Sequence, residues 1–350
     1  MGCVQSRHAM TLASSIELSV VEPLVLHHTS ETPPGFLSQE VLGEAFYAAT
    51  KEREIPGFEF GYLVATRSGK TVATVPYFLT DFKLNTMLEG GWLKRLLGDT
   101  GFRMACVGHP CTPFGRIDGA PSSELMDLVF DCLKQYAPVV SLKGFSKHFP
   151  VTGFVQVKGL PVAVMTVNKN HWKKMSSARR RNLQRKRKKA SALSFDVTEG
   201  LPEHLHTIVY GLYLQTLARS TIHFDQLSLD YFVSTAKISQ YVFAYLDAEV
   251  VGFIQTVRKG EELVALYVGF DEVNNQLHGI YFALGIRLVD MAIEMDCSIL
   301  DLGETHYAFK KALGCELQGT WVYFRFKNYI WHWVMSKFSF LIDPSPKELS

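Results

Sequence analysis

The chain has 350 residues, of which 47% are hydrophobic and 20% are charged, and its formal net charge is +2. This composition excludes global disorder and supplies enough apolar surface for two units that each have a core. No apolar run approaches the roughly 18 residues of a membrane span, and the N-terminus lacks the pattern of a secretory signal, so we expect a cytoplasmic protein.

Cysteines and histidines show no metal-binding pattern. The six cysteines include no Cys-x-x-Cys pair, and no His-x-x-x-His pair accompanies a carboxylate. We therefore predict free thiols and no metal.

The first half of the chain alternates strands and helices. Residues 1–15 have no sustained apolar period and are expected to form a flexible tail. A strand is predicted over residues 16–26, a helix over 38–49, and a hairpin over 58–66 and 71–79. A loop rich in Gly and Pro at 108–119, a helix over 122–135, and strands near 139–143 and 151–167 complete a predicted first domain, residues 16–170.

The second half opens with a basic segment. Residues 172–190 contain ten Lys or Arg and no acid, so the rest of the chain is net acidic. Helices over 202–218 and 228–236 precede three predicted strands, 241–246, 250–258 and 262–270. A helix over 279–295, a strand over 298–302, a helix over 307–313 and a strand over 316–327 follow. The crossover helix requires a parallel strand pair, which predicts a mixed sheet in a second domain, residues 171–328.

The segments at residues 176–189 and 301–314 resemble parts of GNAT acetyltransferases of the BioF-like kind and of their FemAB relatives. Residues 176–189, SSARRRNLQRKRKK, resemble the basic helix that opens the catalytic domain of those enzymes. Residues 301–314, DLGETHYAFKKALG, resemble their strand, turn and Tyr-x-x-Lys helix. The resemblance is clear over residues 172–326 and implies an α/β protein of two tandem GNAT-like domains. Each would be a mixed, mostly antiparallel sheet flanked by helices, with a degenerate first domain and a catalytic second one.

The resemblance also implies where an acyl donor would bind. In GNAT enzymes acyl-CoA lies along a splayed strand, and its pyrophosphate contacts free N–H groups where the next helix starts. The thioester would lie near the amides of Val268 or Gly269, and the pyrophosphate near Gln276, His278, Gly279 and Ile280. The family motif accepts Gln276 and Gly279 but not Tyr281. An aminoacyl-tRNA donor, as in the Fem branch, and an ordinary turn without a ligand therefore stay open.

Acyl transfer to an amine requires a neutral amine and a stabilised oxyanion. Glu304 and His306 follow a predicted strand end, so either could accept the proton. Tyr307 could protonate the leaving thiolate, and Lys310, one helical turn later, could hold a phosphate or the oxyanion. The Fem branch has a functional lysine in a comparable Phe-Lys context, which favours Lys310 over Lys311. A solvated helix start is the alternative for all four residues.

Three further features bear on partners. The basic helix could be a solvated connection, a nuclear import signal, or a phosphate-binding patch of Arg179, Arg180 and Arg181 for tRNA or CoA. The N-terminal MGCVQS fits a myristoylation pattern, so Gly2 and Cys3 would be lipidated in a eukaryotic cell, giving membrane association, or match by chance. The aromatic C-terminal segment, residues 329–350, is expected to pack its rings against the sheet rather than to contact a membrane.

The sequence therefore predicts an enzyme, an N-acyltransferase that moves an acyl group, most simply acetyl, from acyl-CoA to a small-molecule or envelope-precursor amine. The alternatives are a tRNA-dependent aminoacyl transferase of the Fem type and a non-catalytic GNAT-fold protein that binds RNA or an anionic membrane. Neither the acceptor nor the oligomeric state follows from the sequence.

Overall fold

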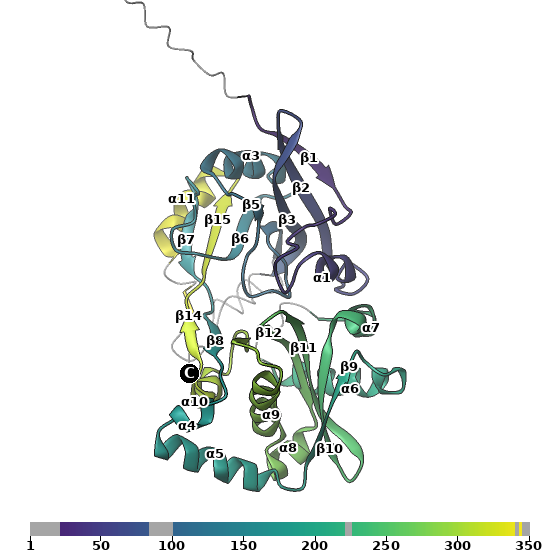
Figure 1. Ribbon diagram of the computed structural model, residues 1–350. Coiled ribbons are helices and arrows are strands. Elements are labelled where there is room, and N and C mark those ends of the chain that lie inside the picture. The colour runs from purple at the N-terminus through teal and green to yellow at the C-terminus, as the bar shows by residue number, and fades with distance from the viewer. Residues whose placement is uncertain (1–21, 84–100, 221–225, 340–342, 345–350) are drawn as a thin grey trace, which may run out of the picture.

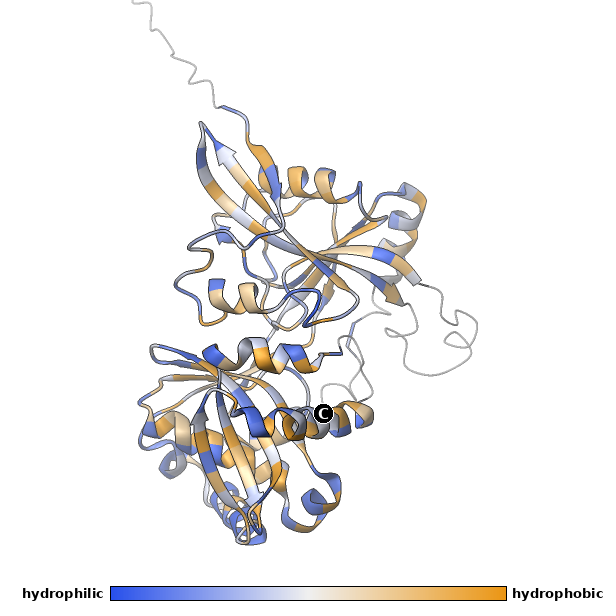
Figure 2. Ribbon diagram, turned by 90° about the vertical axis from the view of Figure 1, so that its right-hand side faces the viewer, coloured by the Kyte–Doolittle hydropathy of each residue, from blue (hydrophilic) through white to orange (hydrophobic). Residues whose placement is uncertain are grey.

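A computed structural model describes residues 22–83, 101–220, 226–339 and 343–344. These residues form two mixed β-sheets with helices, one half of the molecule stacked on the other (Figures 1 and 2). The predicted tail, Gly2, Cys3 and the start of the strand predicted over 16–26 lie outside the described residues. No helix in the described ranges is long and apolar enough to cross a membrane.

The first sheet starts with an antiparallel meander of β1 (Val25–Thr29), β2 (Phe58–Arg67), β3 (Lys70–Lys83) and β4 (Gly101–Val107). Helix α3 (Ser123–Leu133) leads to β6 (Val139–Phe145), which pairs with β4 in parallel. Strands β15 (Trp321–Phe326) and β7 (Val155–Lys158) follow, and the short β5 (Asp118–Gly119) pairs with β3. Helix α1 (Glu44–Ala49) is shorter than the predicted 38–49, since residues 38–43 form turns and bends.

The second sheet has the same plan. Strands β9 (Ser194–Glu199), β10 (Gln240–Leu246), β11 (Glu249–Lys259) and β12 (Glu262–Phe270) form a meander. Helix α9 (Ile280–Glu294) crosses over to β13 (Ile299–Asp301), which pairs with β12 in parallel and confirms the predicted mixed sheet. Strands β8 (Val162–Thr166) and β14 (Glu316–Gln318) complete the order. The other helices are α4 (His171–Lys174), α5 (Ser177–Lys189), η2 (Glu203–Leu205), α6 (His206–Arg219), α7 (Leu229–Thr235), η3 (Ala236–Ile238), α8 (Glu272–His278), α10 (Tyr307–Leu313) and α11 (Tyr329–Phe338).

The two halves exchange strands, which the sequence did not indicate. The strand predicted over 151–167 is two strands, of which β8 lies in the second sheet, and that predicted over 316–327 is also two, of which β15 lies in the first. The two segments cross at Gly159, whose N–H donates to Thr320 O at 2.9 Å. A Cβ at Gly159 would lie 2.4 Å from Thr320 Oγ1, so a side chain here would displace this hydroxyl from its hydrogen bond to Leu160 O. The domain boundary predicted at residue 170 therefore does not coincide with the separation of the two sheets.

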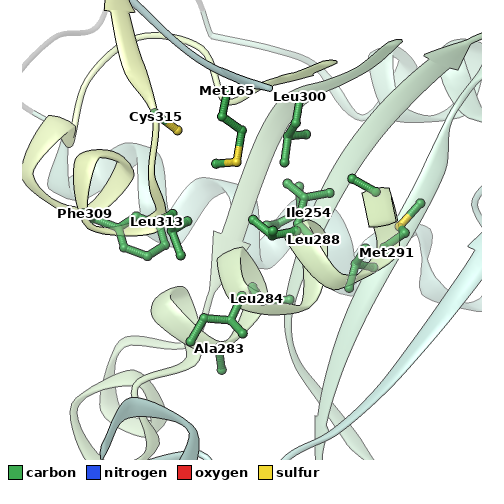
Figure 3. Close-up of a cluster of buried hydrophobic side chains, with 14 of the residues drawn as sticks. Met165, Ile254, Ala283, Leu284, Leu288, Met291, Leu300, Phe309, Leu313 and Cys315 are labelled. Carbon is green, nitrogen blue, oxygen red and sulfur yellow. The ribbon is translucent and has the colours of Figure 1, made fainter. Parts of the chain in front are cut away.

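Four clusters of buried apolar residues hold the fold together, and the smallest surrounds Tyr47 in the first half. Helix α3 covers the first sheet, and α9 covers the second, where Leu284, Leu288 and Met291 lie near Ile254 and Leu300 (Figure 3). A further cluster joins side chains of both sheets with those of α6 and α7, including Phe78, Val157, Tyr213, Phe253 and Phe324. This shared core and the exchanged strands join the two halves through buried apolar contacts and sheet hydrogen bonds.

The prediction for the C-terminal aromatic rings is wrong. Residues 329–338 form helix α11, and the side chains of Tyr329, Ile330, Trp331 and Trp333 are exposed. Only one side of the helix can face the sheet, and Met335 packs there. Helical spacing turns the other rings away from it.

Candidate active site

The candidate site begins where two parallel strands separate. Strands β12 and β13 are paired from Glu262 opposite Ile299 to Val264 opposite Asp301, where β13 ends. Strand β12 continues to Phe270, so among the described residues its last six, 265–270, have no partner strand on that side. The gap beside them, beyond the end of β13, is called the slot. A β-bulge at Leu266 interrupts the pairing with β11 in the same stretch, because Tyr267 pairs with Gln255 and Ala265 with Thr256. Bulges of this kind redirect backbone groups beside functional sites.

At this open edge the backbone N–H of Val268 points into the slot. The N–H of Phe270 points away from β11, since it donates to Thr216 Oγ1 in α6 at 3.3 Å. Successive residues of a strand alternate in direction, so the Val268 N–H also points into the slot, while that of Gly269 points to β11. Of the two predicted donor-binding amides, Val268 is therefore the one that an acyl oxygen can reach.

The predicted phosphate turn is not an open loop. Residues 272–278 form helix α8, which Asp271 caps by accepting the Asn274 N–H at 2.8 Å. Gly279, with φ of 68°, ends α8 and begins α9. In the first turn of α9, the Tyr281 N–H donates to Asn275 Oδ1 at 3.0 Å. The N–H groups that were expected to hold a pyrophosphate are thus partly engaged within the chain.

The other residues predicted to contact the pyrophosphate lie in different surroundings near Gly279. Gln276 is exposed and its carbonyl accepts a bond of 2.6 Å from Lys189 Nζ of α5, His278 is half-buried in α8, and Ile280 lies in the core. Lys186, also of α5, lies over the Phe282 ring at 3.7 Å. The basic helix, which runs along the bottom of Figure 1, therefore brings two ammonium groups to the position predicted for phosphate.

Tyr281 lies in the outer part of the slot. Its ring centroid is 5.5 Å from that of Phe270 on β12, 5.5 Å from that of His306 and 4.7 Å from that of Phe309 on α10. Burial raises the pKa of its hydroxyl well above the ordinary value. Strands β12 and β13 separate as predicted, but the Tyr281 ring narrows the entrance to the slot between them.

Lys310 is buried on α10, with 6% of its surface exposed, and its Nζ donates to Glu304 O at 2.5 Å. Burial lowers the pKa of its ammonium to about 8, and the nearby Cys315, Asp301 and Glu304 partly offset this effect. A lysine that charges near neutral pH can supply a positive charge to an anion formed beside it. Lys311, the next residue, is exposed.

The turn before α10 is strained. Gly303, Thr305 and His306 all have positive φ, which for the β-branched Thr305 is unfavourable. His306 lies at the surface beside Tyr281, and partial burial together with the charge of Lys310 lowers its pKa. The carbonyl of Glu304 contacts Lys310. The turn thus gathers two of the predicted proton acceptors next to the lysine.

Tyr307 is not part of this group. It has no exposed surface, and its hydroxyl donates to Pro161 O at 2.8 Å. This bond joins α10 to the segment that enters β8, which is a packing role. We therefore leave Tyr307 out of the proposed catalytic set.

Asp301, the last residue of β13, is a buried carboxylate near Lys310 that the sequence reasoning did not single out. The side chain is 5% exposed, and its Oδ1 accepts the Gly303 N–H at 2.6 Å. Burial raises its pKa to about 6, against the opposing effects of that hydrogen bond and of Lys310. An aspartate at the end of an apolar strand was the available signal, since such positions face the edge of a sheet.

A cavity of about 30 Å³ lies next to Asp301, between the two halves. Its walls come from the 40–47 segment, the 112–116 loop and strands β12 and β13, and its polar lining consists of Glu40, Tyr47, Thr112, Arg116, Glu262 and Asp301. The 112–116 loop is held by Lys143 Nζ, which donates to Pro110 O and Thr112 O. A larger, open depression of about 330 Å³ between Asp131 and Arg325 is far from the slot, and an ion pair between Arg325 and Asp127 spans it.

The predicted arginines of α5 differ in their surroundings. Arg180 is engaged, because its guanidinium donates to the carbonyls of Lys173 and Met175. Within the described part of the chain, the side chains of Arg179 and Arg181 form no hydrogen bond or ion pair and are exposed. The described residues also contain no group of His, Cys, Asp and Glu that could hold a metal.

Comparison with known proteins identifies the second half. Residues 177–311 match the family model described as "Acetyltransferase (GNAT) domain". The structure of L-PGS from Bacillus licheniformis is similar over 78% of this chain and 87% of that one, with 12% identity and a TM-score of 0.50. FemX gives a TM-score of 0.49 at 10% identity over 80% of this chain and 91% of its own. A tandem GNAT protein of the clavulanic acid biosynthesis pathway also gives 0.49 at 10% identity, over 87% and 99%. No curated protein matches the chain. Residues 177–311 of the chain therefore form a GNAT acetyltransferase-type domain.

Proposed function

We propose that the protein transfers an acyl group, most simply acetyl, from acyl-CoA to an amine at the slot beside β12. The observation that carries this proposal is the unpaired edge of β12, with the Val268 N–H directed into the slot and Lys310 buried nearby. An acyl donor can bind such an edge as an added strand, through main-chain hydrogen bonds. The amide and the ammonium can both stabilise an oxyanion.

The first half is proposed to shape the acceptor side of the site. Strand β4 is paired with β6 up to its last residue, Val107, opposite Leu142, so the described part of the first sheet has no open edge of this kind between these strands. Its loops instead line the cavity beside Asp301. The catalytic role is therefore assigned to the second half.

The test is free thiol release from a panel of acyl-CoAs, with a panel of primary alkylamines as acceptors. The proposal expects thiol release that depends on the amine, with the acylated amine detected by mass spectrometry. If the protein binds no CoA and releases no thiol with any pair, transfer from acyl-CoA is wrong, and an aminoacyl-tRNA donor is then the form of acyl transfer to test.

The exposed basic face of α5 supports a second candidate donor, aminoacyl-tRNA. Charge of this density attracts polyanions, and each lysine or arginine that contacts a phosphate contributes about 0.7–0.9 to the salt dependence of log K. We expect the double variant Arg179→Ala, Arg181→Ala to weaken tRNA binding and to reduce the slope of log K against log salt by roughly 1.4–1.8.

Fluorescence anisotropy of labelled tRNA at several salt concentrations measures both quantities. Lys237→Ala is the matched control, since Lys237 is an exposed cation on η3. Equal slopes for the double variant and the control would remove the tRNA candidate.

A further inference from the structure

We propose that helix α11 is a docking surface for an anionic lipid bilayer, with the side chains of Tyr329, Ile330 and Trp333 among the lipid headgroups and Lys337 beside lipid phosphates. Helix α11 packs on β15 and β7 of the first sheet, whereas the slot lies in the second sheet. The proposal is therefore independent of acyl transfer at β12.

The first reason is the exposure of large apolar side chains on one helix. Tyr329, Ile330, Trp331 and Trp333 are each between 53% and 78% exposed. Single exposed apolar residues are common on protein surfaces, but a group of them on one element marks a binding surface. Helix α11 lies on the outer side of the first half, next to β7, the last strand of the first sheet (Figure 1). This position leaves the group at the surface of the molecule.

The second reason is that the helix is fixed at its start. The Asn328 side chain caps α11 by accepting the N–H groups of Ile330 at 2.9 Å and Trp331 at 3.3 Å. The ring of His332 is tied to β15, because its Nδ1 accepts the Phe326 N–H at 3.4 Å. A helix that is ordered before binding loses less conformational freedom when it binds.

The direction of the exposed face follows from the helical period. Met335 packs into the core that the two halves share, so its side of α11 faces inward. With 3.6 residues per turn, the opposite side of the helix holds four side chains within an arc of about 100°: Tyr329, Ile330, Trp333 and Lys337. The fold therefore directs an aromatic and aliphatic face with one ammonium group away from the core.

The third reason is the charge of this segment. Residues 317–342 contain three Lys or Arg and no Asp or Glu. Arg325 pairs with Asp127, whereas Lys327 and Lys337 are exposed and form no ion pair within the described ranges. Each lysine close to an anionic membrane surface strengthens binding roughly fivefold. The charge of α11 thus complements a surface of lipid phosphates.

The chemistry and the size of this face favour a bilayer over a second copy of the chain. Tyr and Trp combine an apolar ring with a polar group, and they are enriched where membranes meet water. A large aromatic side chain has roughly 150–250 Å² of surface, so the four exposed side chains offer on the order of 500 Å². A stable protein interface uses about 800 Å² from each partner. A short helix that lies in the headgroup region needs only its apolar face and its cations.

The test is co-sedimentation of the full-length protein, made without N-terminal acylation, with vesicles of phosphatidylcholine alone or in an equimolar mixture with phosphatidylglycerol. We expect binding to the mixed vesicles, weaker binding to the neutral ones, and quenching of tryptophan fluorescence by lipids with brominated acyl chains. The double variant Ile330→Ala, Trp333→Ala should lower the partition coefficient at least about 10-fold, because it removes much of the apolar surface.

A second variant and a control complete the design. Lys337→Gln should weaken binding to the mixed vesicles about fivefold and leave binding to the neutral ones unchanged, which decides the question if the double variant does not fold. The matched control is the double variant Val273→Ala, Leu277→Ala, since these side chains are 69% and 63% exposed on helix α8. The control should bind both kinds of vesicle as the wild type does.

Three results would overturn the proposal. The first is a wild type that does not bind the mixed vesicles, and the second is an Ile330→Ala, Trp333→Ala variant that folds and binds them as the wild type does. The third is a wild-type dimer in sedimentation velocity that this variant converts to a monomer, without vesicle binding, which would assign α11 to a second copy of the chain. None of these results changes the expected thiol release from acyl-CoA.

Discussion

Replacing Lys310 by Met should lower kcat for acyl transfer by about 100- to 1,000-fold, the range observed when one oxyanion donor is removed. Methionine keeps the length and the apolar stem of the buried side chain and removes only the ammonium. Because the ammonium loses its charge as pH rises through about 8, the wild-type rate should fall above that pH. The variant should lack this alkaline limb.

The matched control for this prediction is Lys311→Met. Lys311 is the next residue of α10 but is exposed, so its substitution should leave kcat unchanged. The melting temperature of Lys310→Met should equal or exceed that of the wild type, since a buried amine is removed. Equal rates for the two variants would exclude Lys310 from the chemistry.

Replacing Gly269 by Ala should destabilise the protein by about 1–3 kcal/mol, the usual cost of overpacking a core. A Cβ at this position would lie 2.4 Å from the Phe253 ring and 2.8 Å from backbone atoms of Leu212 and Tyr213 in α6. Backbone atoms cannot rotate away, so β12 must shift, and the Val268 amide shifts with it. CoA affinity should therefore fall together with the urea midpoint.

Gly211→Ala is the control, because Gly211 lies in the same helix α6 and a Cβ there would meet no atom within 4 Å. It should stabilise the protein by roughly 0.5–1 kcal/mol, the advantage of alanine over glycine in a helix. A Gly269→Ala variant as stable as the wild type would show that β12 and α6 are not in the tight contact described.

The elements whose periodicity is local could be predicted from the sequence. The hairpin at 58–79, the meander at 241–270, and the helices over 122–135 and 307–313 correspond to β2 and β3, β10 to β12, α3 and α10. In these segments the pattern of apolar residues and the turn residues indicate the same secondary structure, so a single assignment is favoured. The parallel pair of β12 and β13 followed from the crossover helix alone.

The features that depend on distant contacts could not be predicted. Two short strands, β8 and β15, join the sheet of the other half, and nothing in their own residues distinguishes the two sheets. Helix α8 was expected to be a turn because a family motif was placed on residues 276–279, whereas the Asp271 cap and the positive φ of Gly279 form a short helix.

The candidate site likewise contains residues that a local motif indicates and residues that only the tertiary structure brings together. Lys310 was found because it belongs to a recognisable motif, and the structure buries it near the slot. Asp301 and Tyr47 were not singled out, because the cavity that both residues line has walls from both halves of the molecule. Their importance depends on burial next to a shared cavity, which is a property of the tertiary structure.

The central claim is that the open edge of β12 receives the acyl donor, and hydrogen–deuterium exchange with and without acetyl-CoA tests it most directly. The account predicts slower exchange in peptides covering residues 265–270, with the Val268 amide among those protected. Binding of acetyl-CoA that leaves exchange across residues 265–270 unchanged, while protecting another part of the chain, would contradict the account.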